Sequence, residues 1–202
     1  AGQRSASGIE RRVTTGQDAR IALEIMGAEI RMASYNPLFA PGLWVDPARC
    51  GAAADQGRRG IQEASASSLT IEMDLDPDGL CGSSPNEIIR YAYDRRSQRI
   101  TRETIRCTAG SRTSSGAQPF LGPIPSNTAV RTLRVVNGAT PLFRYYDGTG
   151  AEVVNLPAEI QRIRRIEIVL VVESADADPR TGEPRRIAFS TSVVPKNHGV
   201  QF

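Results

Sequence analysis

The chain has 202 residues, of which 40% are apolar and 23% are charged, and its formal net charge is +3. This balance is typical of a globular protein and excludes an intrinsically disordered chain or a coiled coil. No stretch contains the about 20 consecutive apolar residues that a membrane-spanning helix needs. Because the chain begins with Ala1-Gly2 rather than with Met, we expect its original start to precede these residues.

The amino-terminal third predicts a leader, a helix and a loop. Residues 1–12 are mostly small and polar and predict a frayed leader before a single domain over residues 13–202. Residues 13–34 predict the one helix, with Thr14 and Gln17 as a capping box and Pro37 just beyond its end. Residues 35–68 predict a long surface loop with one short helical turn near residues 61–64. We expect Trp44 to anchor this loop to the core.

The predicted helix carries two apolar stripes on roughly opposite sides. One stripe consists of Leu23, Met26, Ile30 and Ala33, and the other of Ile21, Ile25, Ala28 and Met32. A helix at the edge of a monomer needs one apolar stripe, so two stripes predict a helix that is covered on both sides. The second cover is either another part of the same fold or a neighbouring molecule.

Residues 69–202 predict a β-rich region, because the apolar period changes to two. The last strand shows this most clearly, since Ile187, Phe189, Thr191 and Val193 share one face. Such a sheet has one side packed on the core, and the helix is the obvious partner. The fold class is therefore α+β, with one amino-terminal helix packed on antiparallel sheet. The expected strands are residues 69–73, a hairpin of 87–93 and 99–106, a pair at 130–136 and 142–146 joined by Asn137-Gly138, a short strand at 152–155, and the pair 163–172 and 185–194.

Three cysteines and one histidine limit the chemistry of the chain. Cys81 and Cys107 flank the first predicted hairpin, so we predict a disulfide between them, with two unpaired thiols as the alternative because Cys50 leaves the number odd. His198 is the only histidine and lies in a polar carboxy-terminal tail, which excludes most zinc sites and catalytic triads. No nucleophile elbow or phosphate-binding loop occurs, so we expect no enzymatic activity. Arginines are spread among acidic residues along the chain, so we expect no nucleic-acid partner.

One segment resembles the first half of a calcium-binding loop. Asp74, Asp76 and Asp78 occupy positions 1, 3 and 5, and Gly79 occupies position 6, where a sharp turn directs the carboxylates inward. Position 12 is a proline, and Glu87 follows two residues later. We therefore predict Asp74, Asp76, Asp78 and Glu87 as ligands of calcium, the one possible cofactor, with a plain solvated turn as the alternative.

The segment from Ala19 to Pro37 resembles a known family. Its sequence, ARIALEIMGAEIRMASYNP, is similar to the R-x-A-L-x-x-M-x-x-E-I-R-M-A-G-Y-x-P string that follows the membrane helix in PilW-like minor pilins, with Ser34 in place of the family's Gly. Further matches keep the family's order: residues 75–79 with its D-L-D-x-D-G turn, 86–91 with N-E-x-I-x-Y, 143–150 with F-x-Y-x-D-x-x-G, 163–168 with I-R-R-I-x-I, and 192–197 with S-V-x-x-R-N. The related GspJ-like minor pseudopilins match the helix string less well.

This resemblance implies a pilin-like fold and a structural role without covalent chemistry. The subunit would lie near the tip of a type IV pilus or a type II secretion pseudopilus and act in fibre initiation. A peptidase-processed and methylated apolar helix, absent from residues 1–202, would anchor it in the inner membrane of a Gram-negative-type bacterium, facing the periplasm. Its partners would be other minor pilins or pseudopilins and the major pilin, packed against Ile21, Ile25, Ala28 and Met32. The alternative function is an extracellular calcium- or glycan-binding module.

Overall fold

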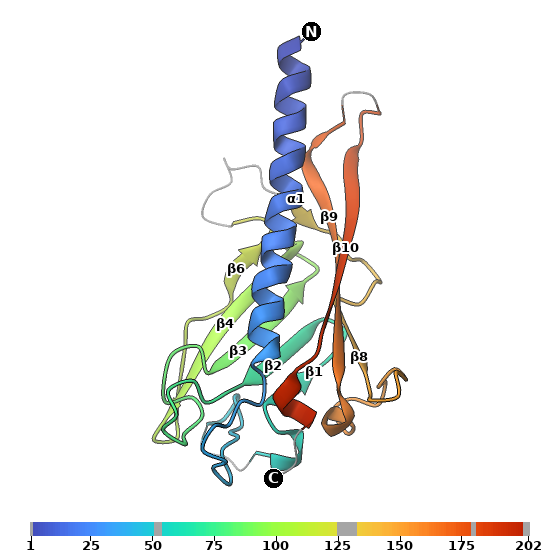
Figure 1. Ribbon diagram of the computed structural model, residues 1–202. Coiled ribbons are helices and arrows are strands. Elements are labelled where there is room, and N and C mark those ends of the chain that lie inside the picture. Colours follow the sequence, from blue (N-terminus) through green and yellow to red (C-terminus); the bar gives the residue numbers. More distant parts are fainter. Residues whose placement is uncertain (1, 51–53, 125–132, 179–180, 200–202) are drawn as a thin grey trace.

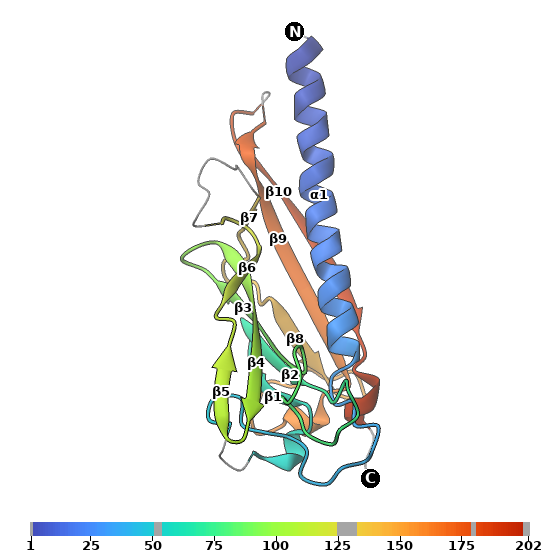
Figure 2. The ribbon, with the colours of Figure 1, turned by 90° about the vertical axis from the view of Figure 1, so that its left-hand side faces the viewer.

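The computed structural model describes residues 2–50, 54–124, 133–178 and 181–199 (Figure 1). In these residues one long α-helix is followed by ten strands in two antiparallel sheets, so the fold is α+β as predicted. Figures 1 and 2 show the helix lying along the β9–β10 hairpin, with its first turns extending beyond the sheets.

Helix α1 spans Gly2–Arg31, which corrects both ends of the predicted helix. Residues 2–12 are helical rather than a frayed leader, so Thr14 and Gln17 lie inside the helix and do not cap it. Extending an existing helix by one residue adds a hydrogen bond at little cost, and this segment contains no proline to stop it. At the other end Ser34 adopts a left-handed φ of 66°, which turns the chain away from the helix axis.

The larger sheet contains six antiparallel strands. The pairing order is β1, β2, β3, β4 and β5, and β6 also pairs with β4. The predicted strands at 69–73, 87–93 and 99–106 are confirmed as β2, β3 and β4. The bounds are β1 Ile61–Ala64, β2 Ser68–Glu72, β3 Ile88–Asp94, β4 Arg99–Thr108, β5 Ser111–Ser114 and β6 Gln118–Leu121.

Three strands of this sheet differ from the sequence-based expectation. The helical turn expected near residues 61–64 is wrong, because these residues form β1 and pair antiparallel with β2. A segment of four residues is too short to show a helical or strand period, so the neighbouring strand decides its conformation. The sequence does not predict strands β5 and β6, because each has only four residues and those of β5 are all polar, so neither shows an apolar period.

The smaller sheet consists of β7 Arg134–Val135, β8 Phe143–Tyr146, β9 Arg165–Ala177 and β10 Pro184–Val193. The predicted β9–β10 pair is confirmed. The expected hairpin across Asn137-Gly138 is wrong, because β7 and β8 both pair with β9 and follow one another along its edge. Between them the Asn137 side chain accepts from Val171 N at 2.9 Å and donates to Val169 O at 2.7 Å, so it replaces a strand in the ladder. Residues 130–132 of that prediction lie outside the described residues, and the strand expected at 152–155 is only an isolated bridge at Glu152.

The main core lies between α1 and the sheets. The predicted stripe of Leu23, Met26, Ile30 and Ala33 is buried. The alternating face of β10 packs on the helix as expected, and Gly27 permits a close approach, since a methyl group there would lie 3.5 Å from Val193 Cγ2.

A second, smaller core anchors the long loop that follows α1. It contains Leu43, Trp44, Cys50, Cys81, Ile88 and Ile105. Trp44 is only 9% exposed, which confirms its predicted anchoring role. Within this loop the structure adds the 3-10 helix η1, Gln56–Arg58.

The disulfide joins Cys50 to Cys107, so the predicted Cys81–Cys107 bridge is wrong. Cys107 N donates to Gly82 O at 2.9 Å, so Gly82 occupies the place beside Cys107. The Cys81 thiol instead lies 3.9 Å from Met73 O and is buried and free. The long loop brings Cys50 to Cys107 across 57 residues, a contact that local spacing does not encode.

Candidate functional site

The second apolar stripe of α1 is the first candidate site. Ile21 and Ile25 are 53% and 42% exposed, and Ala28 is also exposed. Met32, the fourth predicted member, is half-buried and packs against the main core. Among the described residues, therefore, nothing covers the three outer members of this stripe.

The exposed stripe continues into a hollow beside the helix. This hollow has a volume of about 280 Å³ and lies between α1 and β6. Ile21 and Ile25 line it from the helix, and Phe120 and Ile124 line it from the end of β6. Ile124 is itself exposed. Apart from Asp18, the side chains that line this hollow are apolar.

Hydrogen bonds join the carboxy-terminal end of α1 to the larger sheet. Glu29 accepts hydrogen bonds from Arg102 Nη2 at 2.8 Å and from Arg102 Nε at 3.2 Å. The Tyr91 hydroxyl also donates to Glu29. Such a two-point guanidinium–carboxylate contact sets direction as well as distance. It holds the helix, and therefore its exposed stripe, in one orientation on the body.

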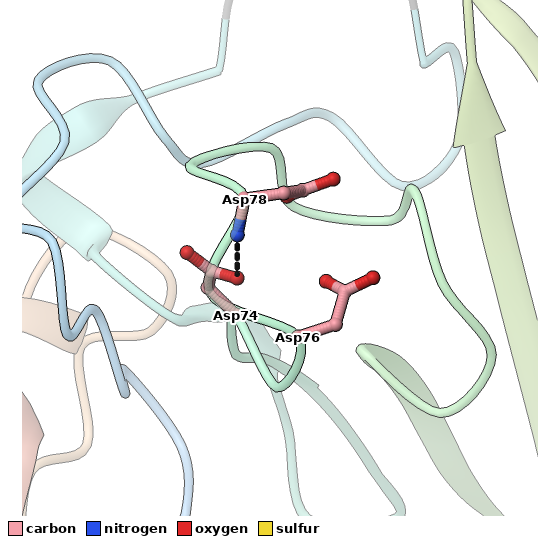
Figure 3. A group of neighbouring side chains, drawn as sticks. All are labelled: Asp74, Asp76 and Asp78. Atoms are coloured by element: carbon pink, nitrogen blue, oxygen red, sulfur yellow. Dashed lines mark hydrogen bonds between the residues drawn. The ribbon is translucent and has the colours of Figure 1, made fainter.

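The second candidate site is the acidic loop after β2 (Figure 3). One carboxylate oxygen from each of Asp74, Asp76 and Asp78 lies within 4.8 Å of the others. Asp74 is buried and accepts from Asp78 N at 3.3 Å and from Gly79 N at 3.1 Å, which folds the loop back on itself. Calcium binds oxygen ligands at about 2.3–2.6 Å, so ligands on opposite sides of the ion are about 5 Å apart. The three carboxylates could therefore hold a metal ion.

Glu87 holds the same loop from inside. Its buried carboxylate accepts three backbone N–H groups, from Leu75, Gly82 and Ser84, each at 3.0 Å. Burial first, and the neighbouring Asp76 carboxylate second, raise the pKa of Glu87. The structure thus places Glu87 beside the three aspartates as a brace, outside the group whose oxygens converge.

Two serine hydroxyls, which the sequence analysis did not predict as part of this site, donate hydrogen bonds to the aspartates of the loop. Ser84 donates to Asp76, and this hydrogen bond is the main reason that the pKa of Asp76 is lowered. Ser83 Oγ donates to Asp78 Oδ2 at 2.8 Å. Each of these carboxylate oxygens keeps a further lone pair for a cation.

Buried acidic groups surround the base of this loop. Glu72 is fully buried and accepts from Val45 N at 3.2 Å, and burial raises its pKa well above the ordinary value. Burial likewise raises the pKa of the Cys81 thiol, and the carboxylates of Glu72 and Glu87 raise it further. Carboxyl groups are therefore concentrated at this end of β2, and burial favours the neutral form of Glu72.

The carboxy-terminal 3-10 helix η3, Lys196–Gly199, carries His198, whose environment differs from the sequence-based prediction. His198 was expected in a polar tail, but its ring is buried. Ring Nε2 lies 2.9 Å from the Ile160 carbonyl, and ring Nδ1 lies 2.9 Å from Ser34 Oγ. Because a carbonyl oxygen only accepts, Nε2 carries the hydrogen and Nδ1 accepts from Ser34. Burial lowers the pKa of His198 to about 4, so the ring is neutral.

Comparisons of the chain with protein-family models, with curated proteins and with solved structures found no match. In the described part of the chain no helix is both long enough and apolar enough to cross a membrane.

Proposed function

We propose that this protein is a structural subunit of a bacterial fibre, a minor pilin or minor pseudopilin that takes part in fibre initiation. One observation carries the proposal. The long helix α1 extends beyond the sheets and keeps an exposed apolar stripe of Ile21, Ile25 and Ala28, while its other stripe packs on the sheets (Figure 2). The segment from Ala19 to Pro37 and the five further segments that resemble PilW-like proteins support the same role.

The exposed stripe suits helix-to-helix packing between subunits. Burying the exposed parts of two isoleucine side chains contributes roughly 2 kcal/mol, which is too little to hold a complex of dilute proteins. Anchoring the partners in one membrane raises their effective concentration and makes such a weak contact sufficient. In this proposal an apolar helix upstream of residue 1 supplies the anchor in the inner membrane. The partners are the helices of other minor pilins or pseudopilins and of the major pilin.

Substituting one member of the stripe tests this role in the bacterium that produces the protein. Ile25→Asp places a charge at the centre of the stripe; because Ile25 is 42% exposed and also lines the hollow beside β6, the free energy of unfolding should fall by about 1–2 kcal/mol. We expect cells that carry this variant to form fewer surface fibres, measured by shearing the fibres from the cells. If the fibre belongs to a secretion system, we expect these cells to export less protein. Val154→Asp is the matched control, because Val154 is 79% exposed and lies outside the helix.

Comparing the two variants tests whether the stripe is needed for fibre formation or export. Fibre formation or export at the wild-type level with Ile25→Asp would refute the role of the stripe. Equal losses with Ile25→Asp and Val154→Asp would show that any added surface charge interferes, which also contradicts the proposal. Sequencing upstream of residue 1 supplies an independent check, since the proposal requires a peptidase site and about 20 apolar residues there.

The acidic loop supports a second candidate function, an extracellular calcium-binding module. We propose calcium rather than a transition metal because the converging groups are all carboxylates, and hard cations prefer oxygen ligands. Titration calorimetry with calcium, with magnesium as competitor, tests the assignment. Saturable calcium binding is expected, and the absence of heat at millimolar calcium would refute it.

A further inference from the structure

A pocket of about 340 Å³ lies where the end of α1, the long loop and the carboxy-terminal turn meet. Its volume is at the lower end of the range for small-molecule sites. Polar and aromatic residues line it together: Ser34, Phe39, Trp44, Gln56, Arg59 and Asn197. It is separate from both the apolar stripe and the acidic loop, because none of the stripe residues or aspartates lines it.

Three lining residues have strained backbones. Ser34, Phe39 and Arg59 have φ values of 66°, 53° and 52°, in the left-handed region that residues other than glycine rarely adopt. Each such residue costs about 1 kcal/mol or more, and residues of this kind cluster at binding sites. Their meeting around one pocket indicates that the surrounding structure maintains its shape.

Hydrogen bonds of Ser34 and Gln56 hold the walls in place. Ser34 Oγ donates to His198 and accepts from Gly60 N at 3.0 Å. The Gln56 amide donates to Trp44 O at 2.7 Å and accepts from Trp44 N at 3.2 Å. These hydrogen bonds fix the backbone of Trp44. The pocket is therefore formed before any ligand binds.

The pocket contains two donor groups that have no anionic partner among the described residues. The Arg59 guanidinium donates to His198 O, and in the described residues it has no carboxylate partner. Burial, and then the positive charge of Arg164, lower the pKa of Arg59, so the charge of a second cation reaches this guanidinium. The half-buried side-chain amide of Asn197 also has no hydrogen-bond partner among the described residues. A bound anion would relieve the repulsion and accept from both groups.

We propose that this pocket binds a small ring-shaped organic carboxylate, with the carboxylate on Arg59 and Asn197 and the ring against the exposed Phe39 side chain. A planar guanidinium matches a carboxylate in two parallel hydrogen bonds, and an exposed aromatic side chain suits the face of a ring. This inference does not depend on the fibre proposal, because it uses a different surface.

Calorimetric or NMR titration of the purified chain with paired probes tests the proposal. Galacturonate and benzoate each carry a carboxylate on a ring, and galactose and benzamide are their neutral counterparts. At least one acid should bind at least tenfold more tightly than its neutral counterpart, and the pair that shows this distinguishes a sugar from an aromatic ring. Equal binding of acid and neutral probe, no binding of either acid at millimolar concentration, or equally tight binding of inorganic phosphate would overturn the proposal.

Two variants locate the binding at this pocket. Arg59→Gln removes the cation, but it also removes the contact with His198 and can lower stability. Asn197→Asp places a negative charge in the pocket without breaking a hydrogen bond between described residues, and it should weaken binding of the acid at least tenfold. Arg96→Gln makes the same charge change as Arg59→Gln in the exposed turn between β3 and β4 and should leave binding unchanged. Unaltered binding with Asn197→Asp would place the ligand elsewhere and refute the assignment.

Discussion

Lowering the pH from 7 to 4 should destabilise this protein through His198. The buried ring has a pKa of about 4, below its ordinary value of 6.5. Between these two pH values the unfolded chain binds a proton that the folded chain does not, so stability falls as the pH falls. A difference of about 2.5 pH units corresponds to a loss of about 3 kcal/mol, complete near pH 4.

Two buried carboxyl groups act in the opposite direction over the same range. The pKa values of Glu72 and Glu87 are raised in the folded state, so the folded chain binds these protons first and gains stability as the pH falls. The pH dependence of the free energy of unfolding is therefore the sum of the opposing contributions of His198 and of these two carboxyl groups. His198→Gln isolates one contribution, because glutamine keeps an amide donor and an acceptor but does not titrate.

The assay is urea unfolding of the natural chain and of the His198→Gln variant at intervals from pH 7 to pH 4. The difference between their free energies of unfolding should shrink by about 3 kcal/mol toward pH 4. Because the sequence has one histidine, NMR of its ring can also follow the titration directly and identify the Nε2–H tautomer. Parallel profiles for the two proteins, or a ring that titrates near pH 6.5, would refute the reasoning.

Three further outcomes are expected. Replacing both Cys50 and Cys107 by alanine should lower the free energy of unfolding by about 4 kcal/mol, because the bridge closes a long loop, and peptide mapping that finds another pairing contradicts the assignment. Gly60→Ala should cost about 3 kcal/mol or more in chemical denaturation, since its methyl group would lie 2.3 Å from backbone atoms on two sides, and a loss under 1 kcal/mol would show that this contact relaxes. Asp76→Ala should lower the melting temperature only when calcium is present, whereas the turn variant Asp94→Ala should behave alike with calcium and with chelator. An equal loss for Asp76→Ala in both conditions would speak for turn geometry alone.

Much of the fold could be predicted from local patterns. The alternation along β10 predicted which side faces the helix, because successive side chains of a strand point to opposite faces. The three- and four-residue spacing in α1 predicted its buried stripe, and the spacing of Asp74, Asp76 and Asp78 predicted a cluster of carboxylates. In each case the residues that matter are close in sequence, so one turn or one strand is enough to bring them together.

Contacts between distant segments were decided by the tertiary structure alone. The long loop carries Cys50 to Cys107, and the His198 side chain is buried against Ser34, which is 164 residues away. The local sequence Asn137-Gly138 predicts a hairpin turn. Instead, the Asn137 side chain forms hydrogen bonds with the backbone of β9. A polar side chain is stable in the interior only when partners meet its hydrogen bonds, and which partners arrive depends on how the whole chain packs.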